Sequence, residues 1–197
     1  MNTLKAEKRD MSIKAKKLRR EGFVTGNLFG RELEDSIPLK FDKAEIEKLL
    51  KVESKGGQVM LEVAGETYDA LIKEVDYNPL KGYVDEIDFQ ALVSNEMVHS
   101  TAEIILENEE KVLSGVLQDE LKEVAYKALP ADLVDKIKVD VAGMKIGDTL
   151  RVKDLEIAKN KNIHITTDPE AVVATVTPVH NVVPETETEA EETAEEK

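Results

Sequence analysis

Three histidines and one glycine-rich segment are the first places where this sequence could carry catalytic or ligand chemistry. His99, His164 and His180 lie far apart along the chain, and none belongs to the His-x-x-x-His spacing that places two ring nitrogens on one metal ion. The segment GMKIGD at residues 143–148 lacks the Gly-Lys-Ser/Thr ending of a phosphate-binding loop, so it predicts a β-turn. Neither feature predicts a reaction centre.

The acidic residues are equally uninformative about catalysis. Asp85, Glu86 and Asp88 offer oxygen ligands of the kind that magnesium prefers, but carboxylates on an alternating strand are typical of a solvated face. Pairs such as Asp119 and Glu120 are common in a chain with 41 Asp and Glu, so they do not indicate general acid–base chemistry. We therefore expect no catalytic residue, no metal site and no cofactor, and the chain is not expected to be an enzyme.

The basic N-terminal segment is the more informative feature. Residues 1–23 hold eight Lys and Arg against three Asp and Glu, a local charge of +5. Such a cluster can neutralise several phosphates of a nucleic acid and release their counterions, and Arg can hold a phosphate with two parallel hydrogen bonds. The alternative interpretation is a solvated helix face with no ligand.

The charge of the whole chain hides this segment. The 197 residues carry a net charge of −14, which on its own argues against a nucleic-acid partner. Residues 181–197 hold seven Glu against one Lys, a charge of −6, which leaves −13 for residues 24–180. The C-terminal segment has too few apolar residues to form a core, so we expect residues 181–197 to be a disordered acidic tail, in the simplest interpretation a solubilising one.

Composition also limits the compartment and the class of protein. The chain has no Cys, which excludes disulfides, thiolate zinc sites and a Cys nucleophile. No apolar run reaches the ~18–20 residues of a membrane span, and the first residues lack the apolar stretch of a secretory signal. We expect a soluble cytoplasmic protein that makes no contact with membranes.

Apolar periodicity predicts a compact first unit at residues 1–92. Helix formers run from Lys14 to a closing Gly22, and Asp42 is placed to cap a second short helix at 43–50. Alternating or glycine-interrupted apolar runs predict strands at 24–30, 36–41, 58–63, 67–72 and 83–92. Short strands with small helices over about ninety residues favour a β-barrel or a mixed α+β unit.

A second unit is predicted at residues 93–180. Its strands are expected at 101–106, 123–129, 137–141, 150–154 and 171–176, with a single turn after Pro130. The fold class is therefore mainly β with short helices (α+β): an N-terminal β-barrel, a β-rich C-terminal domain and the acidic tail.

Several sequence segments, in the same order along the chain, resemble one known family. These are KKLRREGFV at 16–24 with LFG at 28–30, LIKEV at 71–75, NP at 78–79, IDF at 87–89, LPAD at 129–132 and IKVDVAGMKIGD at 137–148. Together they are similar to the bacterial large-subunit ribosomal protein twenty-five family, in its long form with a C-terminal domain (the general stress protein Ctc type). The resemblance covers residues 1 to about 180, and the second-domain match is the most specific.

The resemblance implies a function and a site. It implies a β-barrel that binds 5S ribosomal RNA at its loop E, within a structural protein of the large ribosomal subunit that is a monomer outside the ribosome. The family's contact positions correspond to Arg9, Lys16, Lys17 and Arg19, with Phe29, Gly30 and Asp88 near the same face. Our charge argument adds Lys14 and Arg20 to that list.

The chain departs from the family pattern at four of these neighbouring positions. The usual Pro and Tyr are Thr25 and Phe29, and positions often filled by Gln and His correspond to Asp76 and Glu86. Carboxylates near phosphates weaken binding unless they accept hydrogen bonds from base amino groups or meet a bound magnesium ion. A related barrel that binds transfer RNA as an anticodon-type module stays open as an alternative.

Overall fold

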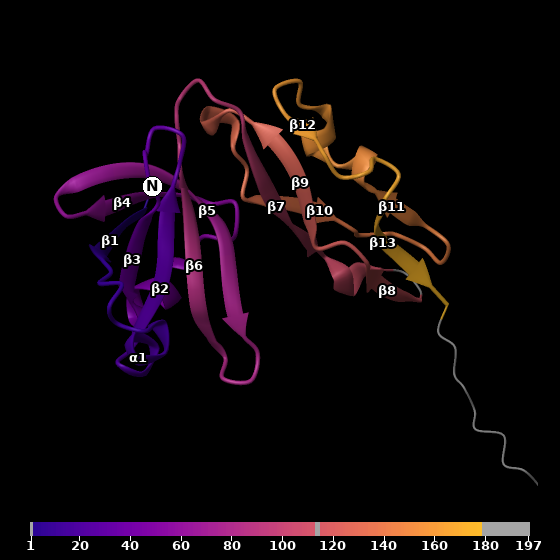
Figure 1. Cartoon of the computed structure of the whole chain (residues 1–197). Coiled ribbons are helices and arrows are strands. Elements are labelled where there is room, and N and C mark those ends of the chain that lie inside the picture. The colour runs from indigo at the N-terminus through magenta and orange to yellow at the C-terminus, as the bar shows by residue number, and fades with distance from the viewer. Residues whose placement is uncertain (1, 113–114, 179–197) are drawn as a thin grey trace, which may run out of the picture.

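The computed structural model describes residues 2–112 and 115–178 and places two β-rich units side by side along the chain (Figure 1). The predicted acidic tail at 181–197 and His180 lie outside the described residues. The elements of the first unit are β1 (Asn2–Lys8), α1 (Ala15–Arg20), β2 (Phe23–Phe29), β3 (Ile37–Asp42), α2 (Lys43–Leu49), β4 (Gln58–Val63), β5 (Glu66–Asn78) and β6 (Tyr83–Ala91).

The strands of the first unit close into a barrel in the order β1-β3-β2-β6-β5-β4. Two pairings in it are parallel, β2 with β6 and β1 with β4, and the latter closes the barrel. Alternate residues point inward, where Phe41 and Phe89 pack with their ring centroids 5.3 Å apart among buried aliphatic side chains. This closed barrel confirms the prediction. It forms because each strand has one apolar face to bury.

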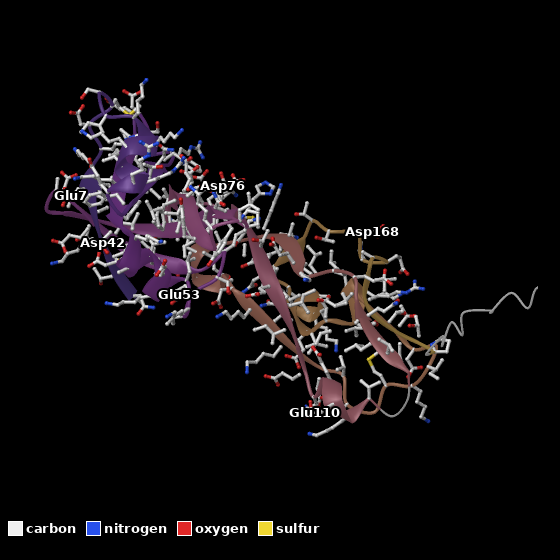
Figure 2. All side chains as sticks on the ribbon, turned by 90° about the horizontal axis from the view of Figure 1, so that it is seen from below. Glu7, Asp42, Glu53, Asp76, Glu110 and Asp168 are labelled. Atoms are coloured by element: carbon white, nitrogen blue, oxygen red, sulfur yellow. The ribbon has the colours of Figure 1, made fainter. Side chains whose placement is uncertain are left out.

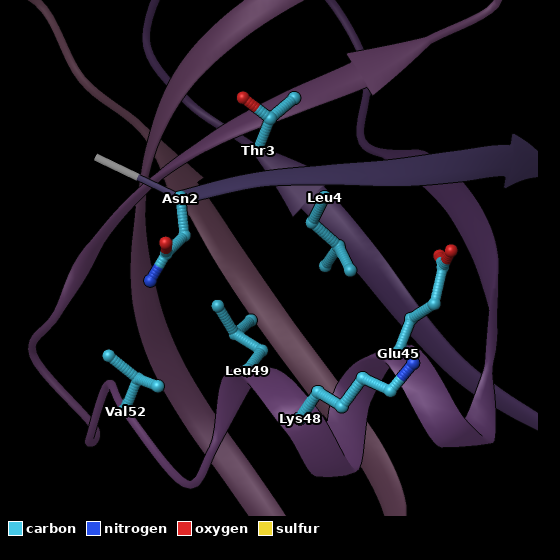
Figure 3. Close-up of a pocket in the computed structure, with 7 residues that line it drawn as sticks. All are labelled: Asn2, Thr3, Leu4, Glu45, Lys48, Leu49 and Val52. Atoms are coloured by element: carbon cyan, nitrogen blue, oxygen red, sulfur yellow. The ribbon is translucent and has the colours of Figure 1, made fainter.

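Helix α2 packs against the first strand of the barrel (Figure 3). Asp42 caps it as predicted, since its carboxylate accepts a hydrogen bond from the backbone N of Ala44 at 2.8 Å. Leu4 of β1 and Leu49 of α2 are buried there, and Glu45 and Lys48 lie at the rim. The hollow of about 390 Å³ that these residues line is thus a packing groove between strand and helix.

The second unit has two sheets over a separate core. One sheet has the order β10-β7-β9-β12 and the other β11-β13-β8. In the core, the Tyr126 hydroxyl donates to the Val134 carbonyl and accepts from the Val134 backbone N, both at 2.7 Å. The elements are β7 (Val98–Glu107), η1 (Glu109–Lys111), β8 (Val116–Asp119), β9 (Glu123–Ala128), η2 (Pro130–Asp132), β10 (Lys136–Asp140), β11 (Thr149–Arg151), η3 (Val152–Asp154), η4 (Glu156–Lys159), β12 (His164–Ile165) and β13 (Val172–Thr177).

The structure corrects several predicted elements. Residues 2–8 form strand β1, where the sequence predicted only a basic segment. The strand was missed because only Leu4 and Ala6 of it are buried. Strand β5 continues to Asn78, whereas the predicted strand ended at 72. The prediction stopped short because two register shifts break the alternation of apolar residues in β5. Strand β7 begins at Val98 instead of 101, and the short strands β8 and β12 were not predicted. The strand predicted at 150–154 ends at Arg151 and continues as the 3-10 turn η3.

Polar contacts and one close backbone approach join the two units. Ser54 Oγ donates to Glu103 at 2.6 Å, Lys55 pairs with Glu123 at 3.2 Å, and Lys136 Nζ donates to the Val52 carbonyl at 2.7 Å. Gly56 lies against β7 so closely that a Cβ atom there would stand 1.9 Å from the Thr101 carbonyl oxygen. The loop at 52–57 therefore holds the second unit against the barrel.

Candidate nucleic-acid interface

Helix α1 presents basic side chains at one end of the barrel, where Figure 1 shows it beneath β2. Leu18 is buried and anchors the helix, whereas Lys14, Lys16, Lys17 and Arg20 are exposed. Lys17 lies 3.8 Å from Glu21 on the next turn. Within the described part of the chain, Lys14, Lys16 and Arg20 form no ion pair, so these three charges are available to a ligand.

Arg19 differs from the other cations of α1 because it is held against the barrel wall. Its Nε donates to the Asp85 carbonyl at 2.9 Å, and its Nη2 lies 3.4 Å from both Thr25 Oγ1 and Glu86 Oε2. The side chain is only 27% exposed. Arg19 thus ties α1 to β6, and the guanidinium edge that it offers to a ligand is already oriented.

Arg9 follows β1, two strands away from β2 in the barrel, and its charge acts on the Glu86 carboxyl group on β6. Its backbone N donates to the Pro38 carbonyl at 2.8 Å, and its Nη2 donates to the Ile13 carbonyl at 3.3 Å. Its Nε is buried and has no hydrogen-bond partner among the described residues. A buried N–H without an acceptor is rare, so this group has donor capacity that the folded chain leaves unused.

Asp88 lies on the outer face of β6, where it holds β2 in place. One of its oxygens accepts hydrogen bonds from the backbone N of Asn27 at 2.9 Å and from Asn27 Nδ2 at 3.1 Å. Phe29 is on the outer face of β2, two residues beyond Asn27. Gly30 follows at a position where a Cβ atom would lie 2.8 Å from the Cβ of Ala91. The structure therefore brings Arg19, Asp88 and Phe29 onto one outer face, with Arg9 near enough to influence Glu86 on it.

An acidic strip borders these cations. Across β5 and β6, Glu74 pairs with Asp88 and Asp76 pairs with Glu86, and the four carboxylates line a shallow hollow. The acidic residues labelled in Figure 2, Asp76 among them, are spread over both units. No group of His, Asp or Glu in residues 2–112 and 115–178 has the arrangement of a metal site.

The strip changes the titration of one carboxyl group. Burial and the Asp88 carboxylate raise the pKa of Glu86, Asp76 adds to this effect, and Arg19 and Arg9 oppose it. The site therefore combines fixed cations with carboxylates that can accept hydrogen bonds from base amino groups.

Comparisons with known proteins agree with this architecture. The profile of the Ribosomal L25p family matches residues 4–89, and that of the C-terminal domain of ribosomal protein TL5 matches residues 97–180. A large ribosomal subunit protein bL25 from Caldanaerobacter subterraneus is 32% identical over 196 residues, which cover 98% of each chain. The bL25 protein of Bacillus velezensis is 32% identical over 182 residues, covering 90% of this chain and 89% of the relative. The chain belongs to the bL25 family.

Membership in bL25 confirms the class of protein expected from the sequence. A bL25 chain is a structural protein of the large ribosomal subunit and not an enzyme. Among the described residues, no helix is long and apolar enough to cross a membrane.

Asn27 of this bL25 surface was missed by sequence reasoning, and so were the positioning roles of Thr25 and Asp85. Thr25, Asn27 and Asp85 hold Arg19 and Asp88 in place, yet they lie up to 66 residues from their partners. Only the pairing of β2 with β6 brings them together. RNA contact stays a prediction for all nine residues, which are Arg9, Lys14, Lys16, Lys17, Arg19, Arg20, Phe29, Gly30 and Asp88.

Proposed function

We propose that this bL25 chain binds 5S ribosomal RNA, at its loop E, through the exposed cations of α1 and the outer face of β2 and β6. Arg9, Lys14, Lys16, Lys17, Arg19 and Arg20 supply the phosphate contacts, and Phe29, Gly30 and Asp88 shape the neighbouring face. In this proposal residues 1–92 form the RNA-binding domain, and the chain resides in the large subunit of the ribosome as a structural constituent.

The observation that carries the proposal is the convergence of cations on one rigid face. Arg19 is held against the outer wall of β2 and β6 beside the exposed lysines of α1, and the charge of Arg9 acts on Glu86 of the same wall. An A-form RNA helix offers a wide, shallow minor groove with phosphates and 2′-hydroxyls, and proteins read it largely by its shape. A small barrel with one basic end can meet such a surface although the rest of the protein is acidic.

A competition experiment tests which RNA the barrel prefers. Full-length protein is bound to labelled 5S ribosomal RNA and challenged with unlabelled 5S RNA, with its isolated loop E stem, or with bulk transfer RNA. We expect the 5S RNA and the loop E stem to displace the label at similar concentrations, and transfer RNA only at far higher ones. Equal displacement by transfer RNA would favour an anticodon-type module instead.

A further inference from the structure

The cleft between the two units gathers cations that the barrel site does not use. About 280 Å³ in volume, it is lined by Lys55 and residues 71–74 of the barrel and by His99, Ser100, Thr101 and Ala125 of the second unit. Lys73 lies where the β5 ladder shifts register between Ile72 and Glu74. Its Nζ crosses the cleft and donates to the His99 carbonyl at 2.7 Å.

A row of basic side chains continues from this cleft across the exposed face of the second unit. In the antiparallel ladders of β7, β9 and β12, Lys127 lies directly opposite His99 on one side and His164 on the other. Directly opposed side chains have Cβ atoms ~5 Å apart, so the three form one transverse row. We call Lys73, His99, Lys127 and His164 the joint cluster.

The joint cluster has little counter-charge of its own. Neither Lys73 nor Lys127 has an ion pair within the described residues, and Glu123 is occupied by Lys55. Glu74 is the acidic side chain that borders the cleft. The pKa of Lys73 is lowered, chiefly by burial and in addition by the charge of Lys55. The pKa of His99 is also lowered, chiefly by burial and in addition by the charges of Lys127 and Lys73. The positive charges of Lys73 and Lys127 thus oppose protonation of His99, and a bound anion would relieve that repulsion.

The cleft is also held in a fixed shape. The Gly56 backbone N donates to the Ile72 carbonyl and the Ile72 N donates to the Gly57 carbonyl, both at 2.9 Å, so the loop at 52–57 is bound to β5. The same loop contacts Glu103 and Glu123 of the second unit. A ligand at the joint cluster would therefore meet side chains from both units without having to order them first.

We infer that the joint cluster is a second RNA-contact surface, which takes the sugar–phosphate backbone of ribosomal RNA beyond the part bound by the barrel. This inference rests on the proposed function, since it adds a contact to the same RNA-binding protein. Charge complementarity identifies the ligand: the row presents nitrogen donors at regular spacing on an exposed sheet face. Those phosphates can belong to the 5S RNA itself or to neighbouring large-subunit RNA, and the test separates the two.

The first test compares salt dependence in full-length variants. Lys127→Gln alone and the triple variant Lys73→Gln, His99→Gln, Lys127→Gln are titrated against 5S RNA and against large-subunit RNA at 50 to 300 mM salt. Each lost phosphate contact reduces the slope of log K against log salt by ~0.7–0.9. On the RNA that occupies the cluster, we expect the triple variant to lose a slope of about 1–2 and roughly three- to tenfold in affinity at ~100 mM salt.

The control variant is Lys159→Gln with Lys161→Gln, two exposed lysines elsewhere in the second unit, and it should behave as wild type. If the triple variant matches wild type on both RNAs, the inference is wrong. Failure of the proposed function looks different: wild type would then ignore 5S RNA, and the α1 cations would not matter. In that event, an equal slope for wild type and triple variant on large-subunit RNA also overturns the inference.

The second test needs no substitution in the cleft. Wild-type protein, alone and with each RNA, is acetylated at its lysines, and the modified fraction at each site is measured by mass spectrometry. We expect RNA to lower acetylation of Lys127 severalfold but to leave Lys159 and Lys161 unchanged. Equal acetylation of Lys127 with and without either RNA would contradict the inference.

Discussion

Arg19 occupies the point where the basic and acidic side chains of the barrel meet. It contacts Asp85, Glu86 and Thr25 at once, and Arg9 lies near enough to influence the same carboxyl group. The ion pair with Glu86 holds Arg19 in position, but the carboxylate also repels an approaching phosphate. In the proposed RNA binding these two effects oppose each other, so we expect the charge of Glu86 to influence affinity.

Glu86→Gln removes that charge while keeping an oxygen that can accept from Arg19. We expect the variant to bind 5S RNA about two- to fivefold more tightly at pH 7, corresponding to the ~0.5–1 kcal/mol of a partly exposed ion pair. The measurement is a binding isotherm beside wild type and Glu156→Gln, an exposed carboxylate of the second unit. Weaker binding by Glu86→Gln would show that holding Arg19 matters more than the repulsion.

The pH dependence of binding follows from the same residue. Because the pKa of Glu86 is raised, chiefly by burial, the group takes up a proton at a higher pH than its usual value of 4.5. In the folded protein the ionised form of Glu86 is disfavoured. Protonation removes the free-energy cost of burying this charge as the pH falls through the raised pKa. Affinity for RNA should therefore rise from pH 7 towards pH 5, and Glu86→Gln should remove this part of the rise.

Asp88 has a structural role on the outer face of β6. Its oxygen holds the backbone and side chain of Asn27, so Asp88→Ala should lower the free energy of unfolding by about 1.5–3 kcal/mol, the range for hydrogen bonds to a charged group. Asp88→Asn keeps an acceptor oxygen and should cost less. Urea unfolding of both variants measures this, and equal loss in the two would contradict the hydrogen-bond explanation.

At the scale of elements, the parallel pairing of β2 with β6 creates the face that we propose for RNA binding. Gly26 allows it, because a Cβ atom there would lie 1.9 Å from the Ile87 carbonyl oxygen. The pairing places Thr25 opposite Glu86, and the hydrogen bonds of Asp88 align Asn27 with it on the same face. The face that carries Arg19 and Phe29 thus depends on one glycine in the core of the barrel.

Gly26→Ala should open this pairing. We expect a loss of more than ~3 kcal/mol in unfolding free energy, since backbone would have to move, together with loss of RNA binding. Gly65→Ala is the matched control: Gly65 has φ +91° and no neighbour within 4 Å, so it should cost only the ~1 kcal/mol of backbone strain. Similar losses in the two variants would show that the close approach of β2 to β6 is unimportant.

Elements with one buried face could be predicted from the sequence, and their register could not. Strands β3, β4 and β6 were found because their apolar residues alternate, and α2 because Asp42 precedes its apolar face. Strand β1 was missed because charged residues surround its two buried ones. The basic character of α1 was visible from composition, but the row of His99, Lys127 and His164 depends on two ladder registers that no local pattern specifies.

At the scale of the whole molecule, a basic end on an acidic protein should fix the orientation in which the proposed RNA ligand binds. The chain carries −14 overall, and the acidic residues labelled in Figure 2 lie on both units. Long-range repulsion by this surface should disfavour non-specific association with RNA, whereas the cations of α1 attract phosphates at short range. The protein should therefore bind RNA only in orientations that present α1 or the joint cluster.

The most direct test of the central claim is the salt dependence of 5S RNA binding by full-length protein. The triple variant Lys14→Ala, Lys16→Ala, Arg20→Ala removes the three exposed α1 cations that form no ion pair, and Lys159→Ala with Lys161→Ala is the control. We predict that the triple variant lowers the slope of log K against log salt by roughly 2–3, at ~0.7–0.9 per phosphate, and that the control keeps the wild-type slope. An unchanged slope in the triple variant, or an equal reduction in the control, would contradict binding through this surface.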